Sequence, residues 1–66
     1  MNAKISVNNG RSFVSAEVAI EKVGFEEITS WMDDKVREEV HSMDFEGDRG
    51  FLEKYLEVSN QDIIVG

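Results

Sequence analysis

Apolar and polar residues alternate with a period of two near the start of this chain, and a short apolar run lies near its end. Residues Ala3–Val7 alternate in this way, which is the pattern of a half-buried strand. The Asn-Asn-Gly sequence at positions 8–10 is a turn signal, and Arg11–Ser15 follows it as the second strand of a hairpin. Asp62–Val65 is expected to form a final short strand that could add to the hairpin.

Two registers are open to the hairpin. A three-residue loop with Gly10 in the left-handed conformation places Ile5 opposite Phe13, whereas a two-residue loop places Ser6 there. The first register gathers Ile5, Val7 and Phe13 on one face of the sheet. Because a buried face should be apolar, we expect the first register.

The segment after the hairpin has two interpretations. Ser15 can cap a short helix over Ala16–Val23, and Gly24 suits the position just beyond the end of that helix. The second strand could instead continue through Ala16–Ile20, where apolar and polar residues also partly alternate. The helix is the preferred prediction.

A longer amphipathic helix is predicted over Ser30–Met43. Ser30 followed three residues later by Asp33 resembles a capping box, and Phe25–Ile28 before it is a link or an early turn of the same helix. Apolar residues recur at helical spacing on one face, with Met43 extending the stripe formed by Met32, Val36 and Val40.

A third helix is predicted over residues 48–58, with Asp48 as its N-cap and an apolar face formed by Phe51, Leu52, Tyr55 and Leu56. The 66 residues then form one small α+β domain, in which an N-terminal β-hairpin and a C-terminal strand pack on two to three helices. A domain of this size has a thin stability margin, and dimerisation would supply further buried surface.

The net charge of −7 changes the range of expected partners. Residues 1–28 contribute −1 and residues 29–66 contribute −6, from ten carboxylates against four basic residues. Direct nucleic-acid binding requires a basic patch, which the sequence lacks, whereas a protein partner with a basic surface is favoured. Acidity also serves solubility alone.

We expect no membrane association, because no apolar run approaches the length of a membrane span and no secretory signal begins the chain. Cysteine is absent, which is compatible with a cytoplasmic location.

Charges on the predicted main helix should largely neutralise one another. Opposite charges four residues apart give two expected ion pairs, Asp33–Arg37 and Lys35–Glu39. Asp34 and Glu38 form a like-charge pair, and neither residue takes part in these two expected ion pairs. Together with the acidic loop that follows, they make the candidate partner-binding surface: Asp34, Glu38, Asp44, Glu46 and Asp48.

No catalytic, cofactor or metal site is predicted. The acidic loop fails the calcium-loop pattern, since counting from Asp44 places Arg49 where glycine is required and Tyr55 where glutamate is required. His41 is the only histidine; the serines do not lie in a nucleophile-elbow pattern, and no cysteine or second histidine is present to complete a zinc site. Its position in the last turn of the main helix suits an interaction with the helix dipole.

Trp31 lies at the predicted start of the main helix, one position from the centre of the apolar stripe. We expect it to complete the core against the hairpin. The alternative is that Trp31 anchors a protein interface, where tryptophan is enriched.

One resemblance covers about residues 29–56. Trp31-Met32-Asp33-Asp34 with Arg37, Glu38 and His41, followed by Phe51-Leu52 and Tyr55-Leu56, resembles a pattern in small, mostly uncharacterised proteins of bacterial phages and plasmids. The resemblance implies a mobile element acting in a bacterial host cytoplasm, where small acidic proteins are often anti-CRISPR or antirestriction inhibitors. Some of these imitate DNA with carboxylates; this chain is less densely charged, and Lys35 and Arg37 half neutralise its helix face.

The resulting functional hypothesis is a non-enzymatic acidic protein that binds a basic, nucleic-acid-handling surface of a host defence complex and blocks it. The alternative is a small structural or regulatory module that homodimerises through its helical face or through the edge of the Asp62–Val65 strand. An enzyme is the least favoured class, because no set of catalytic groups can be assembled.

Overall fold

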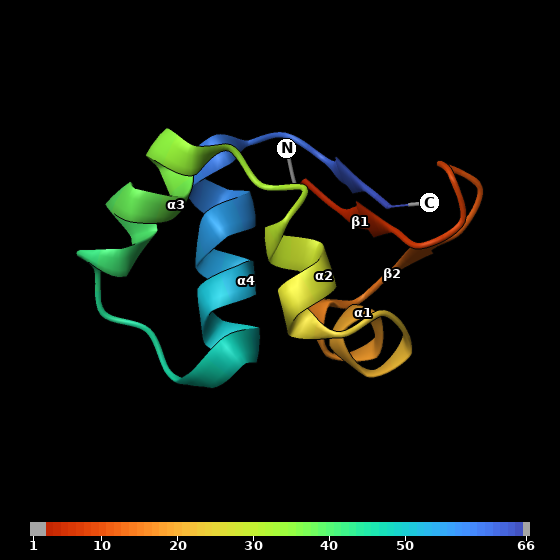
Figure 1. The fold of residues 1–66 in the computed structure, drawn as a ribbon, viewed down its shortest axis with the longest axis horizontal. Helices are drawn as coiled ribbons and strands as arrows, with labels where there is room; N and C mark the ends of the chain where they lie inside the picture. The colour runs from red at the N-terminus through yellow and green to blue at the C-terminus, as the bar shows by residue number, and fades with distance from the viewer. Residues whose placement is uncertain (1–2, 66) are drawn as a thin grey trace.

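The computed structural model describes residues 3–65 and contains three strands and four helices in the order ββααααβ. The strands are β1 (Ile5–Ser6), β2 (Phe13–Val14) and β3 (Ile63–Ile64), and the helices are α1 (Ala16–Lys22), α2 (Phe25–Thr29), α3 (Asp34–His41) and α4 (Gly47–Ser59). Figure 1 shows α4 in the middle, α3 on one side of it, α2 and α1 on the other, and the sheet along one end. The predicted α+β class is confirmed.

The two ends of the chain meet in one three-stranded sheet of order β2-β1-β3. β1 pairs antiparallel with β2 and parallel with β3, so the predicted C-terminal strand does join the hairpin. The N–H of Ile63 donates to the carbonyl of Lys4 at 2.9 Å, and that of Val65 donates to the carbonyl of Ser6 at 2.8 Å.

The hairpin adopts the register that apolar patterning disfavoured. Ser6, not Ile5, lies opposite Phe13, and a two-residue turn at Asn9 and Gly10 connects the strands. Both turn residues have positive φ, 48° and 87°, as a type I′ turn requires, and this turn matches the twist of antiparallel strands. Turn geometry therefore sets the register, and the core face stays apolar because Ile5 pairs with Val14 and Ile63 instead of Phe13.

Ser6 is fully buried in this register, and its hydroxyl has hydrogen-bond partners. Its Oγ accepts from the N–H of Gly10 at 2.7 Å and from that of Asn8 at 3.4 Å. A buried polar group that is satisfied in this way costs little, whereas an unsatisfied one would be expensive. Phe13, on the outer face of the sheet beside it, is 47% exposed.

The preferred interpretation of the next segment, a helix capped by Ser15, is confirmed. The Ser15 Oγ accepts from the N–H of Val18, and the helix ends at Lys22 with Val23 as its C-cap. Gly24 follows with a φ of 103°, a conformation that a residue with a side chain rarely adopts. The chain then turns directly into α2, so Phe25–Ile28 belongs to a helix of its own.

The prediction that the main helix starts at Ser30 is wrong. Ser30 is the C-cap of α2, and its hydroxyl donates to the carbonyl of Glu27 at 2.6 Å. The N-cap of α3 is Asp33, whose Oδ1 accepts from the N–H groups of Lys35 at 2.9 Å and Val36 at 3.2 Å. The helix is therefore shorter at both ends than predicted and stops at His41.

The start of α4 also differs from the prediction. Glu46 is its N-cap and makes no side-chain capping hydrogen bond. Asp48 lies in the first turn, where the helix dipole stabilises a carboxylate. The helix ends at Ser59, within one residue of the predicted end, and Asn60 adopts the left-handed conformation of a C-cap.

The core lies between the helices and the inner face of the sheet. Its buried side chains are Ile5, Ala16, Ala19, Ile28, Met32, Val40, Phe51, Leu52, Tyr55, Ile63 and Val65. The predicted apolar faces of α3 and α4 supply much of it, except that Met43 lies beyond α3 and is 36% exposed. Of the helices in residues 3–65, none has the length and apolar character needed to cross a membrane.

Candidate functional site

Helix α3 lies antiparallel along α4, and this places the predicted acidic residues. The N–H of Asp33 donates to Tyr55 Oη at 2.7 Å near the end of α4, while the His41 ring lies 4.8 Å from the Phe51 ring near its start. The chain then returns through the α3–α4 loop, teal in Figure 1, to the first residue of α4. Asp34 and Asp48 consequently lie toward opposite ends of the α3–α4 pair, and the predicted surface is not one compact patch.

Asp34 does form an ion pair, although the i, i+4 spacing of opposite charges predicted no partner for it. Its Oδ1 accepts from the Arg37 guanidinium at 3.0 Å, an i, i+3 pair. The expected Asp33–Arg37 pair does not form because the Asp33 carboxylate caps the helix. Asp34 is therefore a weaker candidate for a partner contact than Glu38, since an exposed ion pair already engages it.

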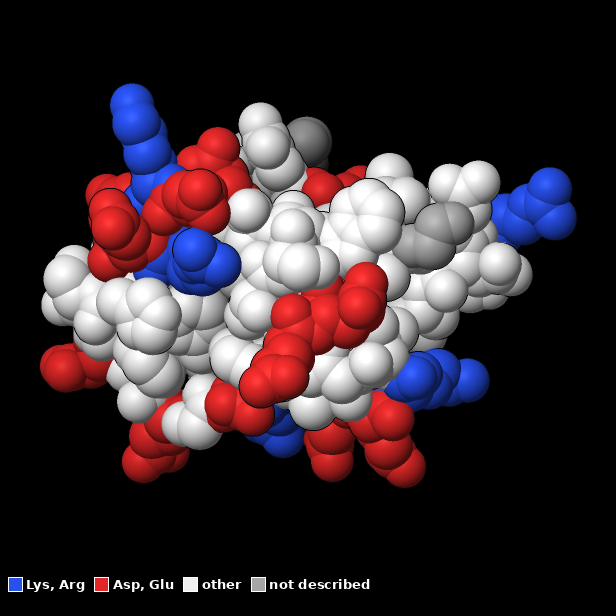
Figure 2. All heavy atoms as spheres, viewed as in Figure 1, with Lys and Arg blue, Asp and Glu red and all other residues white. Residues whose placement is uncertain are grey.

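The remaining predicted carboxylates belong to a stretch that we call the acidic segment, residues 38–48. It contains five carboxylates and neither lysine nor arginine. All five are exposed, and none forms an ion pair with any residue in the range 3–65. Figure 2 shows red carboxylates separated by uncharged surface along the lower left, where this loop runs.

Exposed apolar side chains lie within the acidic segment itself. Phe45 is 38% exposed and Met43 is 36% exposed, each next to Asp44 in the sequence. The Phe45 ring packs edge-on against Phe51, with ring centres 5.0 Å apart, and its centre lies 6.2 Å from that of His41. The loop is thus held on α3 and α4 by aromatic contacts while its outer side stays in water.

A recess opens beside these rings between α2, α3 and α4. We call it the aromatic recess; its volume is about 410 Å³, and its lining residues are Phe25, Thr29, Arg37, Glu38, His41 and Phe51. Phe25 and Phe51 meet edge to face with ring centres 5.7 Å apart; Phe25 is partly exposed, whereas Phe51 is 2% exposed. Glu38 and Arg37 bring opposite charges to it, and Arg37 is already paired with Asp34.

Sequence reasoning identified Glu38 and His41 but missed the recess. Phe25 comes from a helix that the sequence merged with the next one, and Phe51 was assigned only to the core. The available signal was the run of aromatic residues on either side of the acidic loop, at positions 41, 45 and 51. His41 does occupy the last turn of α3, as predicted.

Trp31 does not complete the core. It is 52% exposed in the turn between α2 and α3, and its Nε1 donates to Glu27 Oε2 at 3.1 Å. Because α3 begins three residues later than predicted, Trp31 is not on the helix whose apolar face enters the core. The alternative, an interface anchor, remains a proposal.

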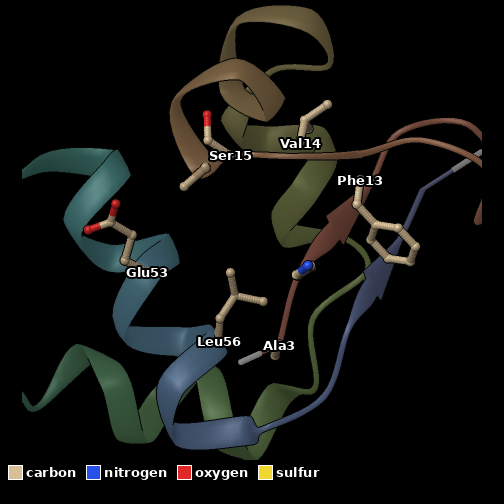
Figure 3. Close-up of a pocket in the computed structure, with 8 residues that line it drawn as sticks. Ala3, Phe13, Val14, Ser15, Glu53 and Leu56 are labelled. Atoms are coloured by element: carbon tan, nitrogen blue, oxygen red, sulfur yellow. The ribbon is translucent and has the colours of Figure 1, made fainter. Parts of the chain in front are cut away.

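The other end of the molecule has a different charge. Residues 3–16 contain Lys4 and Arg11 and no carboxylate, and Figure 2 shows only basic charge at the hairpin tip on the right. A second recess of about 420 Å³ lies between the hairpin and α4 (Figure 3). Its apolar wall includes Phe13 and Leu56, with Glu53 on the α4 side.

Within residues 3–65, no three His, Cys, Asp or Glu side chains gather as a group that could hold a metal ion. Comparison of the chain with protein-family models, curated proteins and solved structures gives no match.

Proposed function

We propose that this protein works by binding, and that its acidic segment contacts a basic protein surface that otherwise holds nucleic acid. The observation that carries the proposal is the acidic segment: five exposed carboxylates with no lysine or arginine among them, next to the aromatic recess. Positive potential on a partner would be attracted to this surface and would steer association. The phage or plasmid resemblance supports a more specific form, in which the partner is a host defence complex in the bacterial cytoplasm.

Charge balance elsewhere on the molecule supports the same surface. The Arg49 guanidinium lies 3.4 Å from a carboxylate oxygen of Glu17 and 3.5 Å from one of Glu53, so these two carboxylates on the α1–α4 side are paired. The acidic segment has no comparable arginine. The carboxylates that would contact the partner are therefore Glu38, Asp44, Glu46 and Asp48, which are exposed and form no ion pair within residues 3–65.

The test is capture of nucleic-acid-binding proteins from a nuclease-treated bacterial lysate, followed by elution with duplex DNA or with salt. We expect DNA to release the captured protein and binding to fall steeply with ionic strength. Glu38→Gln combined with Asp44→Asn should reduce recovery. Glu21→Gln combined with Glu57→Gln removes the same charge from elsewhere and is the matched control. The proposal would be refuted if the amount of captured protein did not change with added DNA, with salt or with the Glu38→Gln and Asp44→Asn substitutions.

A second candidate function, homodimerisation, is favoured by one observation on the sheet. Phe13 and Ile64 are exposed, at 47% and 45%, and lie opposite Ser6 on the two edge strands, so they share the outer face. Sedimentation equilibrium over a wide concentration range tests it. A dimer that Ile64→Ser dissociates supports this candidate, and a monomer at every concentration excludes it.

A further inference from the structure

The aromatic recess and the exposed Phe45 form one surface, joined through His41, because Phe51 is itself only 2% exposed. Phe45 packs on Phe51 and lies beside His41, and both of these residues line the recess. Met43 adds a flexible apolar side chain in the same loop. Methionine adapts to different apolar partners and is frequent at surfaces that accept helices.

Carboxylates come to this surface from α3 and follow in the sequence around Phe45. Glu38 lines the recess from α3. On the loop side Asp44 and Glu46 flank Phe45 in the sequence, and Asp48 lies on α4 one turn before Phe51. The basic side chain at the recess, Arg37, is paired with Asp34. An occupant that is apolar in the centre and basic at its margins would thus satisfy both kinds of surface.

We infer that this surface docks a basic amphipathic helix of the partner, with one large apolar side chain in the aromatic recess and lysine or arginine side chains against Glu38 and the loop carboxylates. An amphipathic helix supplies this arrangement because its apolar stripe is flanked by its polar face. The inference rests on the proposed function, since it names the chemistry of the partner that the acidic segment would contact.

The experiment measures binding of a synthetic helical peptide of leucine and lysine, about 14 residues or four turns long, to the full chain by fluorescence anisotropy. A second peptide has the same composition with leucines distributed around all faces. The amphipathic peptide should bind at least about tenfold more tightly than its scrambled counterpart.

Two phenylalanine variants provide the matched comparison. Phe45→Ser should weaken binding of the amphipathic peptide by about tenfold, whereas Phe13→Ser, at an exposed site on the sheet, should change it less than about twofold. Glu38→Gln should weaken binding and flatten its salt dependence without removing an apolar contact. Circular dichroism and thermal unfolding establish that each variant is folded, and Glu38→Gln provides a test that does not alter the aromatic packing.

The outcomes separate the two proposals. Equal, salt-sensitive binding of both peptides, with Phe45→Ser no different from Phe13→Ser, would overturn the helix-docking inference and leave the acidic interaction surface standing. If neither peptide bound at low salt, the helix-docking inference would be overturned. The lysate experiment would then test the proposed function separately.

Discussion

The backbone N–H of Asp33 donates a 2.7 Å hydrogen bond to the hydroxyl of Tyr55, which lies 22 residues later on α4. This bond joins the first residue before α3 to the central helix. It also gives a hydrogen-bond partner to the hydroxyl group of Tyr55, whose side chain is otherwise buried in the core. The position at which α3 starts is consequently linked to the packing of α4.

Tyr55→Phe should destabilise the protein, because it removes the hydrogen bond and leaves the Asp33 N–H without this acceptor. We expect a loss of about 1 kcal/mol, or a fall in Tm of roughly 4–8 °C for a chain of this size. Denaturant unfolding monitored by circular dichroism measures it. A matched loss of one exposed hydroxyl, Ser12→Ala, should have almost no effect; equal effects of the two changes would contradict the role of Tyr55.

Asp33→Ala should lower the free energy of unfolding by about 1 kcal/mol, because it removes the side chain that caps α3. Ser30→Ala should cost less, since Ser30 closes α2 and caps no helix N-terminus. Chemical denaturation of the two variants distinguishes the observed start of the helix from the start predicted by sequence. A larger loss for Ser30→Ala would favour the sequence prediction.

Ser6→Ala should destabilise the hairpin by about 1–2 kcal/mol, because the N–H of Gly10 loses its acceptor at a buried site. Gly10→Ala should cost a similar amount for a different reason, the positive φ at that position, where about 1–2 kcal/mol is typical for a residue with a Cβ. Thermal unfolding measures both. If Ser6→Ala proved neutral while Gly10→Ala did not, the turn conformation alone would determine the register.

Trp31 provides a direct optical test of its own placement, since it is the single tryptophan in the chain. Because it is half-exposed, its fluorescence should be quenched efficiently by acrylamide and its emission should shift little on unfolding. Trp31→Ala should change stability by less than about 0.5 kcal/mol, as for a typical surface substitution. Blue-shifted, poorly quenched emission would instead place Trp31 in the core.

The exposure of the acidic segment could be predicted from the sequence alone, because charged side chains go to the surface unless they are paired. What the sequence did not reveal is which carboxylates are engaged. Arg37 can reach a carboxylate at either i−3 or i−4, and the choice depended on the use of Asp33 as a cap. The aromatic recess was equally hidden, since it joins Phe25, His41 and Phe51 from three helices.

Local chemistry by itself determined the elements whose signals lie within a few residues: the Asn9-Gly10 turn, the Ser15 cap and the apolar face of α4. These follow from backbone preference, capping and helical period, which do not depend on the rest of the chain. The tertiary structure decided between local options of similar energy. Ser30 and Asp33 are both good caps, and the packing of Tyr55 and Met32 selects Asp33. At the hairpin, the Asn9-Gly10 turn sets the register, and the folded structure accommodates it because the buried Ser6 hydroxyl accepts a hydrogen bond from the N–H of Gly10.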